Sequence, residues 1–167
     1  MPFFRARPPL TPEEIEASLP YASARHAFWM DMRTMRPIDE AIAGASLGQV
    51  IAYCVHYSHA DICNGGFHQY FSNSTGDYAS LTIDALRTLG DDRRADLMTR
   101  AMGRFPGGVA PKSQARRQAV LATIDYESDW RVWCGPIEKA YYALGGEDLG
   151  RRVQEYVASH ASDYFLE

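Results

Sequence analysis

One stretch of fourteen residues, from Asn64 to Asp77, constrains the fold more than any other part of the sequence: it holds three glycines, two asparagines and three aromatic residues. Glycine is the residue that adopts a positive φ or allows close backbone approach without steric cost. Short amide side chains near such turns usually bond backbone groups that irregular chain leaves unpaired. We therefore predict a rigid, hydrogen-bonded corner, in which the aromatics form a tightly packed turn of helix. The residues of this motif are Asn64, Gly65, Gly66, Phe67, Gln69, Tyr70, Phe71, Asn73 and Gly76.

Apolar residues recur at helical spacing along the rest of the chain, and no segment shows the two-residue alternation of a strand. The sequence predicts an all-α fold of about seven to nine helices in one compact domain over residues 11–167, after an extended proline-rich arm over residues 1–10. The expected helices begin near Thr11 and Tyr21, run from Ser46 to about Ile62, and begin again near Asp77, Asp91 or Asp92, Ser113, Pro136 and Leu149. The corner should join the helix that ends near Ile62 to the helix that Asp77 caps, and Gly90 should end the latter in a left-handed conformation.

The bulk properties exclude several classes of protein. A net charge of −4 and a pI near 5.7 argue against general binding of nucleic acid, which requires neutralisation of phosphates. No apolar run is long enough to span a membrane, and the first nine residues lack the apolar core of a signal peptide, so we expect a cytoplasmic protein with no membrane contact. The three cysteines are expected to be free thiols.

A metal or hydrolytic site is the alternative interpretation of one helix face. His56, His59 and Cys63 are spaced by three and four residues, so they share a face, and imidazole with thiolate suits zinc. His68 could add a fourth ligand, or act as a base for Cys63. The same pattern is also that of a polar helix face with an unpaired thiol. We therefore expect no cofactor and assign no catalytic residue. Three carboxylates, Asp61, Asp77 and Asp84, could form an acid–base set, although nothing distinguishes them from helix caps and surface acids.

Charge is concentrated in one short segment. Asp125, Glu127 and Asp129 form the densest acidic patch, and Arg131 follows directly. This patch is the candidate contact surface for a basic partner.

The motif also carries a family resemblance. Asn64-Gly65-Gly66-Phe67, Gln69-Tyr70-Phe71 and Asn73-Ser74-Thr75-Gly76 resemble the hallmark of the DNA-mimic-protein-like family, a bacterial domain of unknown function. Weaker similarity continues through Ala85-Leu86, Leu89-Gly90, Phe105-Pro106, Tyr141-Tyr142, Tyr156-Val157, His160 and Phe165, so that it spans about residues 46–166.

The resemblance implies an all-helical, non-enzymatic protein that binds a DNA-binding regulatory protein by imitating the charge pattern of duplex DNA. A studied member is an acidic dimer, so it also implies a homodimer. In this sequence 21 acidic residues are offset by 17 basic ones, which departs from a dense acidic surface. The leading hypothesis is a protein-interaction module. The alternatives are the metal or hydrolytic domain and direct nucleic-acid binding through paired arginines on helices.

Overall fold

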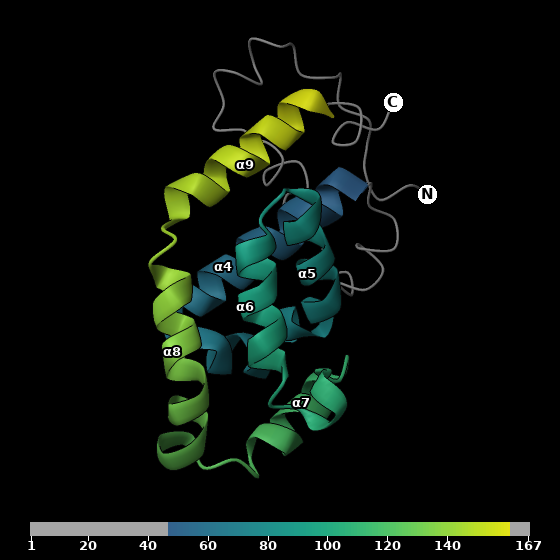
Figure 1. Ribbon diagram of the computed structural model, residues 1–167. Helices are drawn as coiled ribbons and strands as arrows, with labels where there is room; N and C mark the ends of the chain where they lie inside the picture. The colour runs from purple at the N-terminus through teal and green to yellow at the C-terminus, as the bar shows by residue number, and fades with distance from the viewer. Residues whose placement is uncertain (1–46, 161–167) are drawn as a thin grey trace, which may run out of the picture. The chain divides into compact units, whose positions relative to one another are not determined.

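Residues 47–160 of the chain are described by the computed structural model (Figure 1). This part is helical throughout and contains no strand. Its six α-helices are α4 (Leu47–Ser72), α5 (Ala79–Thr88), α6 (Asp92–Met102), α7 (Gln114–Leu121), α8 (Arg131–Tyr142) and α9 (Gly146–Ser159). Short 3₁₀ turns, η1 (Ser74–Tyr78) and η2 (Pro106–Gly108), and one π-helical turn, η3 (Tyr126–Trp130), connect them.

The all-α prediction is therefore confirmed for the described residues. Their six α-helices are fewer than the seven to nine expected for the whole chain. The extended arm over residues 1–10 and the two helices expected between Thr11 and Met35 lie outside the described residues. The chain divides into two compact units, residues 54–148 and residues 1–53 with 149–167, and each is treated separately below. The single domain over residues 11–167 stays a prediction.

The longest helix, α4, is kinked at the motif. Gly65 has φ −153° and ψ 26°, and Gly66 has φ 71° and ψ −173°, so the helix stops and restarts at Phe67. The helix expected to end near Ile62 thus continues to the kink, and the aromatic residues after it form a second short helical segment. A glycine is needed at Gly66 because a positive φ is sterically costly for other residues.

The unit of residues 54–148 has an aromatic core. In this unit α5 packs against α6, and α6 packs against α8 (Figure 1). The second segment of α4 supplies Phe67, Tyr70 and Phe71, all fully buried, and η3 and α8 contribute Trp130 and Tyr141. The ring centroids of Phe67 and Tyr141 are 5.6 Å apart and those of Phe71 and Trp130 are 6.3 Å apart, in edge-to-face orientations that favour aromatic packing. The motif therefore lies at the centre of this core.

Several predicted helix ends agree with the structure. Gly90 has φ 69°, as expected of a glycine that follows a helix, and the Asp91 side chain caps α6 by accepting from the backbone N–H of Arg94. Ser113 is the residue before α7, although its side chain makes no capping hydrogen bond. The apolar residues at helical spacing in α6 and just after it are all buried: Ala95, Met98, Ala101, Met102 and Phe105.

Other predicted ends are wrong. Asp77 does not cap α5; it lies within η1, and its carboxylate pairs with Arg117 instead. Pro136 does not begin a helix but lies inside α8. Pro136 has no N–H to donate to the carbonyl of Val132 one turn earlier, so the helix continues past it without that hydrogen bond. Two apolar residues that fit the helical pattern, Leu47 and Leu81, are exposed.

The unit of residues 1–53 and 149–167 is described only at its helical parts. Ile51 and Tyr53 are buried on α4, and Leu149, Val153 and Val157 form a buried stripe on α9 at spacings of four residues. Among the described residues, no helix combines the length and apolarity needed to cross a membrane.

Candidate functional site

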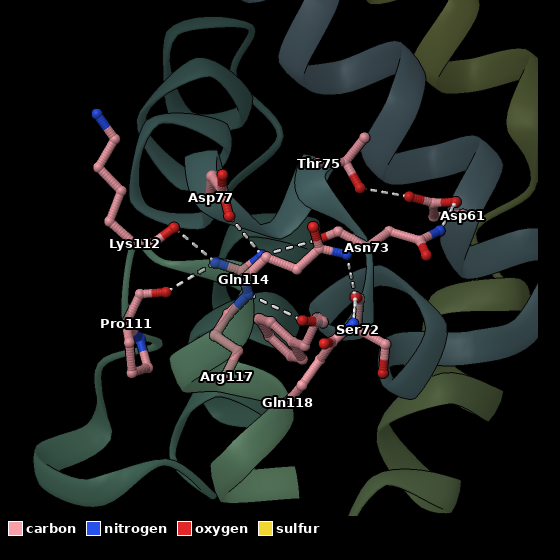
Figure 2. Close-up of polar contacts among 11 residues, drawn as sticks. Asp61, Ser72, Asn73, Thr75, Asp77, Pro111, Lys112, Gln114, Arg117 and Gln118 are labelled. Carbon is pink, nitrogen blue, oxygen red and sulfur yellow. Dashed lines mark hydrogen bonds and ion pairs between the residues drawn. The ribbon is translucent and has the colours of Figure 1, made fainter. Parts of the chain in front are cut away.

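The polar residues of the motif converge on one carboxylate, that of Asp61. Its Oδ1 accepts hydrogen bonds from Asn73 Nδ2 at 2.8 Å and from Gln69 Nε2 at 3.2 Å, and its Oδ2 accepts from the Thr75 hydroxyl. Asn64 extends the network by donating to Gln69 Oε1 at 3.2 Å. Because Asp61 precedes the kink and its three donors follow it, these bonds hold the two segments of α4 and η1 in one geometry (Figure 2).

Replacing Asp61 with Asn should lower the free energy of unfolding by about 1–2 kcal/mol. One carboxylate oxygen would become an NH₂ group, which cannot accept a hydrogen bond from the side chains that now donate to Asp61. The control is Asp84→Asn, since Asp84 is exposed and its carboxylate is 4.0 Å from Arg87. That change should stay within about 0.5 kcal/mol. Urea denaturation measures both, and equal effects would show that the Asp61 network does not hold the corner.

A second carboxylate, from Glu138 of α8, caps the restart of α4. The backbone N–H of Phe67 donates to Glu138 Oε1 at 2.9 Å. A negative charge at this position satisfies a backbone donor and complements the positive end of the helix dipole. A Cβ atom on Gly66 would lie 2.3 Å from the same Oε1. Any other residue at position 66 would therefore displace the Glu138 carboxylate from its hydrogen bond with Phe67, a cost separate from that of the positive φ.

The third anchor is a buried arginine, Arg117 of α7, whose side chain has no exposed area. Figure 2 shows its guanidinium directed at carbonyl groups at the end of α4, just after α4, and in the loop before α7. Nε donates to the Phe71 carbonyl at 2.8 Å, Nη1 donates to the carbonyls of Pro111 and Lys112, both at 2.8 Å, and Nη2 donates to that of Asn73 at 2.7 Å.

The remaining partner of Arg117 is the carboxylate of Asp77, 2.6 Å from Nη2. A Cβ atom on Gly76 would lie 2.9 Å from Arg117 Nε, so this glycine makes room for the guanidinium. Gln114 and Gln118 of α7 add hydrogen bonds to the carbonyl of Ser72, at 2.8 and 2.9 Å. The motif is thus held by contacts from both α7 and α8. Its polar atoms form hydrogen bonds within the protein.

The proposed metal face does not assemble. Among residues 47–160, no group of three or more His, Cys, Asp or Glu side chains is arranged to hold a metal ion. The ring of His56 packs edge-to-face on Tyr57, with centroids 5.1 Å apart. The ring of His68 packs against those of Tyr126 and Trp130. Neither histidine therefore joins the other candidates.

His59 and Cys63 are neighbours without the geometry of a reactive pair. Cys63 Sγ is 3.7 Å from Nδ1 and 3.6 Å from Nε2 of His59. Because the sulfur is nearly equidistant from both nitrogens, it lies off the lone-pair direction of each, where neither a proton transfer nor a shared metal is favoured. Nδ1 of His59 is also 3.2 Å from the Tyr141 hydroxyl.

The electrostatics of the thiols agree with this geometry. Burial raises the pKa of Cys63, and it raises the pKa values of Cys54 and Cys134 to about 12. Burial, followed by the nearby Arg94 guanidinium, lowers the pKa of His59. A thiolate is the nucleophilic form of cysteine, so none of these thiols is activated at neutral pH. The three carboxylates considered as an acid–base set also stay apart: Asp61 and Asp77 have the partners given above, and Asp84 lies on the exposed side of α5.

The acidic patch on η3 is largely compensated. Asp125 caps the turn, accepting from the Ser128 N–H at 2.7 Å and from its hydroxyl at 2.6 Å, and these bonds lower the pKa of Asp125. Glu127 pairs with Arg131 at 2.7 Å, and Asp129 pairs with Arg104. Of these three acids, Glu127 is the most exposed, and unlike Asp125 its carboxylate does not accept a hydrogen bond from the backbone of η3.

Arg117 and Glu138 were the functional residues of the corner that the sequence did not reveal. Each lies more than forty residues from its contacts in the motif. Arg117 forms an arginine pair with Arg116, and such a pair on a helix is typical of a solvated, charged face. The one available signal was the unusual run of glycines and amides, which requires donors and acceptors from elsewhere in the chain.

The comparisons with known proteins give one match. The family model described as DMP19-like protein, a family of DNA mimic proteins, matches residues 44–160. Searches of curated proteins and of solved structures found no match. The match covers most of the chain, and it includes the kinked helix, the corner and all of its anchors. This chain therefore belongs to the DMP19-like protein family.

Proposed function

We propose that this chain is a non-enzymatic protein-interaction domain whose partner is a DNA-binding regulatory protein. The observation that carries the proposal is the family match over residues 44–160, since the family is one of DNA mimic proteins. A protein that binds at the DNA-binding face of a regulator requires complementary charge and shape and no reactive group.

The chemistry of the described residues supports the non-enzymatic part. The polar side chains of the motif are engaged in holding helices together, and the thiols have raised pKa values. The alternative, a metal or hydrolytic domain at His56, His59 and Cys63, has no geometric support in the described residues.

The charge distribution supports binding through a limited acidic patch and not through a uniformly acidic surface. Acidic and basic residues are nearly balanced between residues 47 and 160, and many of the acids are paired. We place the contact at η3, because Asp125 and Glu127 are exposed there beside the exposed ring of Tyr126. Aromatic residues flanked by charge are typical of the energetically important parts of interfaces.

The proposal is tested by affinity capture from a lysate of the source organism, with duplex DNA as competitor. The full chain should retain a DNA-binding protein at low salt, and either high salt or excess duplex should release it. The proposal would be contradicted if the chain retained no DNA-binding protein, or if excess duplex DNA did not release the retained protein.

Substitution of Glu127 by Gln should reduce that capture several-fold, because it removes the exposed carboxylate of the patch without disturbing the Asp125 cap or the Asp129 pair. The matched control is Glu155→Gln, since Glu155 forms an equivalent exposed pair with Arg151, also at 2.7 Å. Quantifying the captured protein for both variants measures the effect. Equal capture by the wild type and by Glu127→Gln would remove the patch as the contact surface.

A further inference from the structure

The ring of His68 links α4 to η3 at the edge of the aromatic core. Its centroid is 5.1 Å from that of Tyr126 and 5.5 Å from that of Trp130, and both pairs are edge-to-face. Trp130 is buried, and its Nε1 donor has no hydrogen-bond partner among the described residues. His68 therefore contacts both ends of the five-residue π-helical turn that carries the acidic patch.

The charged groups around His68 stabilise an imidazolium less than its burial disfavours one. Glu138 of α8 is the nearby carboxylate, and it already accepts from the N–H of Phe67. The acids of η3 itself are engaged with Ser128, Arg131 and Arg104. A proton on His68 would therefore place a charge in a partly buried site between two aromatic rings, where only Glu138 attracts it.

We propose that His68 is a pH-sensitive latch, which holds η3 against α4 while its imidazole is neutral and releases the turn when the imidazole is protonated. The latch consists of His68, Tyr126 and Trp130. It goes beyond the proposed function, since it is a property of the packing and does not require the partner.

The direction of the pH dependence follows from the histidine. Burial lowers the pKa of His68, and the attraction of Glu138 only partly offsets this effect. Because the released state has the ordinary pKa of about 6.5, protons favour release as the pH falls below that value. Asp125 has a lowered pKa, so its cap stays ionised at pH 5.5 and does not account for such a change.

The test is hydrogen exchange on the full chain at pH 7.5 and pH 5.5, corrected for the intrinsic exchange rates. The reporters are the amides of Asp129 and Trp130, which both donate to the carbonyl of Asp125. In the wild type their protection should fall by up to about tenfold at pH 5.5, as expected for a single titrating histidine, while the amides of α6 keep theirs.

Three variants make the test specific. His68→Phe keeps a ring and cannot be protonated, so the turn should stay protected at both pH values. His68→Gln should give low protection without pH dependence. His59→Gln should behave as the wild type, because His59 contacts Tyr141 and not η3. An unchanged wild-type turn at pH 5.5, or an equal loss of protection in His68→Phe, would overturn the latch.

Discussion

Substitution of Gly66 by Val should lower the free energy of unfolding by about 3–5 kcal/mol. Two causes add. With φ 71° and ψ −173°, Gly66 has a backbone conformation that is essentially restricted to glycine, which costs another residue about 1–3 kcal/mol, and a β-branched residue more. The new Cβ would also lie 2.3 Å from Glu138 Oε1, so the carboxylate must move and leave the Phe67 N–H unpaired, which costs about 1–3 kcal/mol. Thermal and urea unfolding measure the loss.

The matched control is the same substitution at Gly107. This glycine also has a positive φ, 69°, but a Cβ there would meet no atom within 4 Å. Gly107→Val should therefore show only the conformational cost of about 1–2 kcal/mol. Gly107 has ψ 10°, nearer the left-handed helical region than Gly66. If Gly66→Val is no more destabilising than Gly107→Val, neither the approach of Glu138 nor the backbone conformation of Gly66 makes the corner depend on glycine.

Substitution of Arg117 by Met should lower the free energy of unfolding by about 3–5 kcal/mol, the range observed when one partner of a buried ion pair is removed. The change leaves the carbonyls of Phe71, Asn73, Pro111 and Lys112 without this donor, and it leaves the Asp77 carboxylate without its counter-charge.

Arg116 provides the control, because it is the same residue type, one position earlier on α7, and it is exposed. Arg116→Met should change stability by less than about 0.5 kcal/mol. Arg117→Lys offers a second variant if the Met variant does not fold. A lysine keeps the charge and loses the planar fork, so its stability should fall between those of the wild type and Arg117→Met. Equal unfolding midpoints for Arg117→Met and Arg116→Met would show that the buried guanidinium does not hold the corner.

The helical class and many helix ends could be predicted from the sequence because their causes are local. The inward face of α6 follows from helical periodicity, and the cap at Asp91 and the positive φ of Gly90 follow from preferences of single residues. The motif from Asn64 to Gly76 was identifiable for the same reason, since its glycines and amides are unusual within a few residues of chain.

The partners of the motif could not be predicted because they are distant in sequence. Nothing local distinguishes the buried Arg117 from the exposed Arg116, or marks Glu138 as the cap of a helix restart seventy-one residues earlier. Aspartate is a common N-cap residue, but Asp77 instead forms an ion pair with the distant Arg117. The helical spacing of His56, His59 and Cys63 predicted a shared face and could not show where each ring packs.

The proposed function requires that this chain and duplex DNA compete for one surface of a DNA-binding protein. The most direct measurement is the fluorescence anisotropy of a labelled duplex bound to the captured protein, titrated with the full chain. We predict that the anisotropy falls to that of free duplex, that the chain's apparent affinity weakens with salt, and that Glu127→Gln shifts the midpoint to higher concentration. An anisotropy that stays constant or rises, as expected when the chain binds the protein–DNA complex without displacing the duplex, would contradict the account.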